Sequence, residues 1–132
     1  DKVLRIESLD HSILDWNQSI QLAANKEDLA QDLLKMLVDS FPTELHKIEQ
    51  LIEMEDFPQL EHVLHRLYGA TRYVGTPQLQ QITGEFEQFI STLRKERRKA
   101  DKQFIQATLE RLTQLKHAIE QVENAAKHIF NA

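Results

Sequence analysis

The chain has 132 residues, a formal net charge of −5 and no cysteine, and its pI is near 5.7. This length fits one domain with one hydrophobic core. The acidic balance argues against nucleic acid as the default partner, and the absence of cysteine excludes a disulfide framework and thiolate chemistry. No apolar run approaches the ~20 residues that a membrane-spanning helix needs, and no signal peptide is evident.

Helical spacing of apolar residues runs through most of the chain, and no stretch alternates as a strand would. We expect residues 1–12 to form an N-terminal extension or linker. A short helix is predicted for residues 16–24, with Asp15 as its N-cap. A long helix is predicted for residues 26–55, and Pro42 inside it should kink or break it.

The next two helices have clear boundary residues. Asp56 is the expected N-cap of a third helix that ends near Val74. Gly75 is expected to end this helix in the left-handed cap conformation. Thr76 and Pro77 then suit the N-cap and the first position of a fourth helix.

A charged segment, "RKERRKAD", leads to Asp101, the expected cap of a fifth and long helix. Four long amphipathic helices joined by short loops favour an all-α, antiparallel four-helix bundle over residues 13–132, with the short additional N-terminal helix as a lid. The basic cluster in the charged segment is interpreted as a solvated helix end. It consists of Arg94, Lys95, Arg97, Arg98 and Lys99.

His65 lies in the third helix, on the side away from the expected core. At about 100° per residue, the apolar stripe of this helix lies roughly 140° from His65 and roughly 120° from Arg72. Gly69 is one turn beyond His65, also opposite the core, although glycine weakens a helix interior by roughly 0.5–1 kcal/mol. Its plausible use is a gap that lets another macromolecule approach the imidazole. The stripe consists of Leu60, Val63, Leu64, Leu67, Thr71 and Val74.

Other interpretations of the histidines stay open at this point. An exposed helical histidine usually has no function, and His62 and His65 at i, i+3 could both contact a metal. The Glu-x-x-His pairs of a di-iron bundle do not occur, so no metal site is expected. A bundle that only docks partners, or one that binds a ligand, remains an alternative to a chemical role. The remaining histidines, His11, His46, His117 and His128, are expected to be solvated.

The segment "HRLYGATRYVG" resembles the signature of histidine-containing phosphotransfer (HPt) domains. His65, Leu67, Gly69 and Gly75 match that signature. The preceding "FPTELHKIEQLIEMEDFPQLEHVLHRL" resembles the family's second and third helices. "ILDWNQSIQLAANKEDLAQDLLKMLVDSF" is similar to the start of the C-terminal HPt module of BarA-type hybrid sensor histidine kinases. The resemblance covers about residues 13–130.

This resemblance implies a phosphocarrier without independent turnover. A receiver domain of a hybrid kinase would phosphorylate His65, by family analogy on Nε2, and a response-regulator receiver would then accept the group. No cofactor is expected on this chain, because the partner receiver would supply the magnesium. The chain, which begins at Asp1, is expected to be the cytoplasmic C-terminal part of a sensor kinase anchored in the inner membrane.

One position departs from the family pattern. Many HPt domains have lysine three residues after the histidine, whereas this chain has Tyr68, which carries no charge. Arg72 on the same face is the candidate to supply the missing charge, because guanidinium suits phosphate geometry, and replacement of the lysine by another residue stays open as the alternative. Glu61 and His62 complete the residues that we expect near the phosphoryl group or at the docking surface, together with Tyr68, Gly69 and Arg72.

Overall fold

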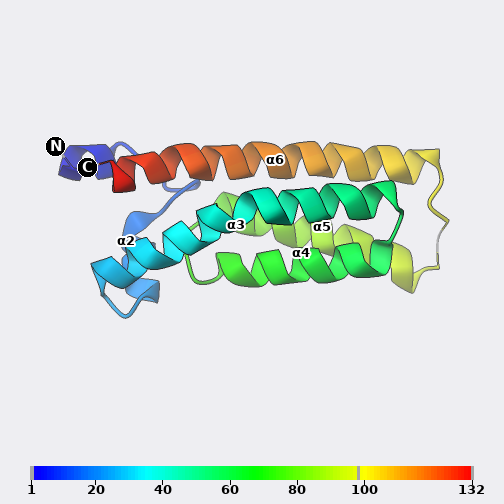
Figure 1. Ribbon diagram of the computed structural model, residues 1–132, viewed down its shortest axis with the longest axis horizontal. Helices are drawn as coiled ribbons and strands as arrows, with labels where there is room; N and C mark the ends of the chain where they lie inside the picture. Colours follow the sequence, from blue (N-terminus) through cyan, green and yellow to red (C-terminus); the bar gives the residue numbers. More distant parts are fainter. Residues whose placement is uncertain (1, 98, 132) are drawn as a thin grey trace.

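The computed structural model describes residues 2–97 and 99–131, so Arg98 lies outside the described residues. The described chain is all-α, with six helices and no strand (Figure 1). These helices are α1 (Lys2–Glu7), α2 (Trp16–Leu22), α3 (Glu27–Glu53), α4 (Phe57–Thr71), α5 (Pro77–Lys95) and α6 (Lys102–Phe130).

Helices α3 to α6 form the predicted antiparallel four-helix bundle. Contacts join α3 to α4, α4 to α5, α5 to α6 and α6 back to α3, and successive helices run in opposite directions (Figure 1). The short helix α2 packs on α3, as expected for an additional N-terminal helix. The sequence did not predict α1, which lies against α6, where the Arg5 guanidinium donates a hydrogen bond of 2.6 Å to the carbonyl of Asn131.

Three aspartates are the N-caps of helices, as the sequence predicted. The carboxylates of Asp15, Asp56 and Asp101 each accept a hydrogen bond from the backbone N–H three residues later, at 3.0, 3.2 and 2.8 Å. These bonds satisfy donors that have no partner inside the helix. Thr76 precedes α5 but makes no such side-chain cap.

Pro42 does not break α3, which continues through it to Glu53. Figure 1 shows the first half of α3 inclined to its second half, which agrees with the alternative of a kink. Phe41 and Ile48 on either side are buried in the bundle core. Their burial stabilises the helix on both sides of the proline, so that one lost backbone hydrogen bond is tolerated.

The prediction that Gly75 adopts the left-handed conformation is wrong. Helix α4 ends at Thr71, and no described glycine has a positive φ. Gly75 instead allows a close approach, since a Cβ there would lie 2.4 Å from the backbone oxygen of Asp15. Asp15 N–H also donates to the Gly75 carbonyl at 2.8 Å, and Gly75 N–H donates to Ser19 Oγ at 2.9 Å. Two hydrogen bonds therefore link the turn before α5 to α2 and its N-cap.

A left-handed cap does occur at the end of α3, where the residue is not glycine. Glu55 has a φ of 54°. Its N–H donates to the Ile52 carbonyl at 3.0 Å, and Asp56 N–H donates to the Leu51 carbonyl at 2.9 Å. These two bonds form a Schellman motif, which turns the chain sharply into α4.

Aromatic packing fixes the start of α4 against α6. The rings of Phe57 and Phe104 meet edge to face at 5.2 Å, and Phe104 stacks on Phe89 of α5 at 5.0 Å. Helix α4 is therefore held at its first turn, eight residues before His65. None of the described helices is both long and apolar enough to cross a membrane.

Candidate functional site

His65 projects from the outer face of α4, as the helical spacing predicted. Its side chain is 71% exposed. The six residues of the predicted apolar stripe are all buried. The core stripe therefore fixes the rotation of α4 about its axis, and this rotation holds the imidazole in solvent on a rigid helix.

Glu87 of α5 determines how the imidazole of His65 is oriented. Its Oε1 lies 2.7 Å from His65 Nδ1, and its side chain is only 21% exposed. An ionised carboxylate can only accept hydrogen bonds, so Nδ1 carries the proton and donates it. In the neutral ring the lone pair then resides on Nε2, which the carboxylate leaves available as a nucleophile.

A second ion pair joins α4 to α5 beside His65. The Arg94 guanidinium near the end of α5 pairs with the carboxylate of Glu61, which lies one turn before His65. Arg94 is therefore not merely part of a solvated helix end, as the sequence suggested. Both pairs border one open hollow of about 650 Å³. It is lined by Pro58, Gln59, Glu61, His62, His65, Glu87 and Arg94.

The surface around Gly69 is open. Apart from its two chain neighbours and the backbone of its own helix, a Cβ added at this position would meet no atom within 4 Å. Because the glycine has an ordinary helical backbone, no conformational requirement explains it. The free space agrees with the interpretation of Gly69 as a gap beside the imidazole.

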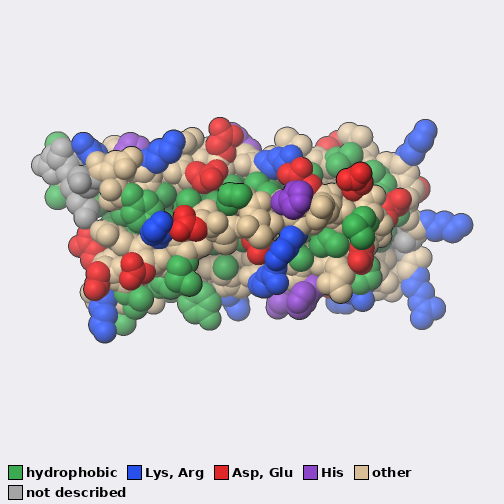
Figure 2. Space-filling model, viewed as in Figure 1, with side chains coloured by type: hydrophobic (Ala, Val, Ile, Leu, Met, Phe, Trp, Pro, Cys, Tyr) green, Lys and Arg blue, Asp and Glu red, His purple; other side chains and the backbone are tan. Residues whose placement is uncertain are grey.

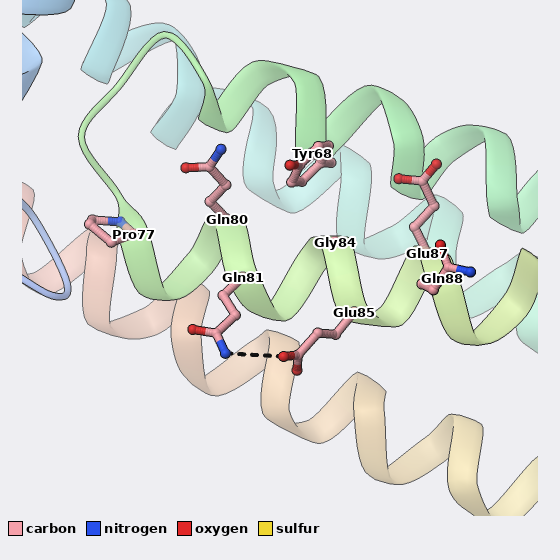
Figure 3. A pocket seen from close by; sticks show the side chains of 8 residues that line it. All are labelled: Tyr68, Pro77, Gln80, Gln81, Gly84, Glu85, Glu87 and Gln88. Carbon is pink, nitrogen blue, oxygen red and sulfur yellow. Dashed lines mark hydrogen bonds between the residues drawn. The ribbon is translucent and has the colours of Figure 1, made fainter.

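Tyr68 has a different environment from the one that the sequence predicted. Its ring packs on α5 over Gly84, where an added Cβ would lie 3.0 Å from Tyr68 Cε2 (Figure 3). The Arg72 guanidinium lies 5.4 Å from the centre of the same ring. Tyr68 and Glu87 line a neighbouring groove of about 530 Å³, while Arg72 lines neither this groove nor the hollow at His65.

Sequence reasoning missed Glu87, Gly84 and the pairing of Arg94. All three depend on the register between α4 and α5, which the spacing within a single helix does not reveal. A usable signal was Gly84 itself, a second glycine inside a predicted helix. It marks a close approach of a large side chain, in this case Tyr68.

The other histidines show no comparable environment. His62 is exposed and lines the hollow at His65. His11, His46, His117 and His128 are exposed, as expected. Within residues 2–97 and 99–131, no group of three or more His, Cys, Asp or Glu side chains is arranged to hold a metal ion.

Charges of both signs are interspersed over the surface. Figure 2 shows acidic and basic side chains alternating along one face, and Lys and Arg side chains projecting at the end where α5 leads into α6. That face presents no extended field of one sign. Its character suits a protein partner better than a polyanion.

The chain is similar to part of known sensor histidine kinases. It is 34% identical over 86 residues to the histidine-protein kinase BarA of Escherichia coli K12, which covers 65% of this chain and 9% of BarA. It is 43% identical over 68 residues to the sensor protein GacS of Pseudomonas syringae, covering 52% of this chain and 8% of GacS. The chain thus spans about a tenth of the length of these relatives.

A solved structure has the same fold. The HPt domain of a sensor hybrid histidine kinase from Shewanella matches with a TM-score of 0.62 and 30% identity, over 86% of this chain and 95% of that domain. The family model described as the Hpt domain matches residues 32–125, which include α4, α5 and His65. The chain therefore belongs to the Hpt domain family, and its role is that of a phosphocarrier in a two-component phosphorelay.

Proposed function

We propose that His65 carries the phosphoryl group, and that Nε2 is the atom that accepts it. The hydrogen bond of 2.7 Å between His65 Nδ1 and Glu87 supports this assignment most directly. It leaves Nε2 unprotonated on a ring that is 71% exposed. An imidazole that is both oriented and accessible meets the geometric requirement for in-line attack on a phosphorus atom.

The transfer step that we propose balances in charge and in protons. Nε2 forms a bond to phosphorus as the bond between phosphorus and the carboxylate oxygen of the donor breaks, and the donor aspartate leaves as a carboxylate. The ring becomes positively charged, and its Nδ1 proton stays in the hydrogen bond to Glu87. The negative carboxylate stabilises this charge electrostatically. Onward transfer reverses the same step toward a second aspartate.

The partners that we propose are receiver domains, one in a hybrid kinase and one in a response regulator. Magnesium bound to the receiver would neutralise charge on the transferring group, so this chain needs no cofactor of its own. The open space at Gly69 supports docking of a bulky partner close to His65. Such partners imply that the domain works in the cytoplasm, as part of a membrane-anchored sensor kinase.

Labelling with a phosphorylated receiver domain tests this proposal. The 132-residue chain should acquire acid-labile phosphate, and His65→Gln should fold normally but take up none. His62→Gln is the matched control, because His62 is an exposed histidine on the same helix and lines the same hollow. Label that persists in His65→Gln, or that disappears only in His62→Gln, would contradict the assignment.

A further inference from the structure

The hollow at His65 has an unusual charge balance for a site that holds a phosphoryl group. Phosphorylated side chains carry about −1.5 to −2 charges at neutral pH. Two of the lining residues, Glu61 and Glu87, are acidic. Of the described residues that line the hollow, Arg94 alone has a permanent positive charge, and its guanidinium is paired with the carboxylate of Glu61.

Arg94 lies close enough to change partners. Glu61 precedes His65 by four residues on α4, which is a rise of about 6 Å. The guanidinium at Glu61 is therefore about one helical turn from the imidazole. The Arg94 side chain is 47% exposed, so neighbouring atoms do not enclose it. His65 and Arg94 both line this hollow, so a phosphoryl group on the imidazole would lie in the part of the surface that Arg94 borders.

We infer that Arg94 is a phosphoryl-binding residue that exchanges Glu61 for the phosphoryl oxygens when His65 is phosphorylated. A phosphoryl group offers three acceptor oxygens and more negative charge than a carboxylate, and the planar guanidinium can bind two of them at once. Glu61 holds the arginine in place before transfer and competes for it afterwards. This inference rests on the proposed function, because it requires phosphate on His65.

The geometry favours Arg94 over Arg72 for this role. Arg72 lies over the ring of Tyr68, and it does not line the hollow at His65. Tyr68 is directed toward Gly84 and borders the neighbouring groove. The expectation that Arg72 supplies the charge thus becomes the competing outcome of the test.

The test is a ³¹P NMR titration of the 132-residue chain after chemical phosphorylation with phosphoramidate. The phosphohistidine-65 signal is assigned by its loss in His65→Gln. Arg94→Gln should raise the pH midpoint of that signal by about 0.2–0.7 of a unit, the shift equivalent to an exposed ion pair. Because phosphoramidate requires no receiver, this result is independent of whether receiver domains label the chain.

A double-mutant cycle isolates the exchange itself. Glu61→Gln should lower the pH midpoint of the phosphohistidine signal. The decrease should be larger when Arg94 is present than in the Arg94→Gln background, because Glu61→Gln frees the guanidinium only when Arg94 is there. Equal effects in both backgrounds would mean that Glu61 acts only through its own charge, and would overturn the exchange.

Two further variants complete the test. Arg66→Gln is the matched control: it breaks the ion pair of 3.1 Å between Arg66 and Glu44, which also joins two helices but lies outside the hollow. It should leave the midpoint unchanged. A midpoint that responds to Arg72→Gln and not to Arg94→Gln would overturn the assignment.

Discussion

Nδ1 of His65 and Oε1 of Glu87 lie 2.7 Å apart, although the two residues are 22 positions apart in the chain. The antiparallel pairing of α4 and α5 brings them together. The pair gives the imidazole a preferred tautomer and one orientation. Both properties matter for a nucleophile that must meet a phosphorus atom in line.

The first prediction concerns this pair. Glu87→Ala should raise the fraction of His65 with the proton on Nε2, and it should slow loading from a phosphorylated receiver by roughly 3- to 10-fold, which corresponds to the loss of one typical net hydrogen bond. Glu87→Gln can still accept the hydrogen bond but has no charge, so its effect should be smaller. The tautomer is measured by ¹⁵N NMR. Unchanged tautomer and loading rate in Glu87→Ala would show that the carboxylate has no orienting role.

The second prediction separates helix stability from docking at Gly69. Gly69→Ala should raise the free energy of unfolding by up to about 1 kcal/mol, because alanine is the better helix former and its Cβ meets no neighbour within 4 Å. Gly69→Gln should fold equally well yet transfer phosphate more slowly, since its side chain occupies the space beside His65. Thermal unfolding and transfer rate are compared for the two variants. A glutamine variant with the wild-type transfer rate would remove the docking role.

The third prediction is that alanine at Gly75 lowers the stability of the domain, whereas alanine at Gly69 raises it. A Cβ at Gly75 would lie 2.4 Å from the backbone oxygen of Asp15, which cannot move without disturbing the start of α2. Gly75→Ala should therefore lower the free energy of unfolding by about 1–3 kcal/mol, the usual cost of overpacking. Denaturant unfolding beside Gly69→Ala gives a matched comparison. Equal stability of the two variants would show that the Asp15 contact relaxes at little cost.

Much of this fold follows from properties within single helices. Apolar spacing, three aspartate caps and the proline at the start of α5 predicted the bundle and placed His65 in solvent. The Gly75 prediction failed because it treated the residue as a local cap. The actual requirement is contact with Asp15, 60 positions earlier in the chain.

The immediate surroundings of His65 could not be predicted in the same way. Glu87 and Arg94 both lie on α5, and their partners depend on how α4 and α5 are aligned along their axes. Spacing within one helix gives its buried face but not its register against a neighbour. Gly84 was a partial signal, because a second glycine inside a helix suggests a close contact there, but only the structure shows that Tyr68 makes it.

The last prediction concerns the contact between Tyr68 and Gly84. Alanine at position 84 would gain up to about 1 kcal/mol of helix propensity. Its Cβ, however, would lie 3.0 Å from Tyr68 Cε2, so the ring must move by a few tenths of an ångström. Gly84→Ala alone should thus change the free energy of unfolding little, whereas in a Tyr68→Ala background it should be stabilising by about 1 kcal/mol. Denaturant unfolding of both single variants and the double variant measures this coupling. Additive effects would show that the Tyr68 ring does not require a glycine beneath it.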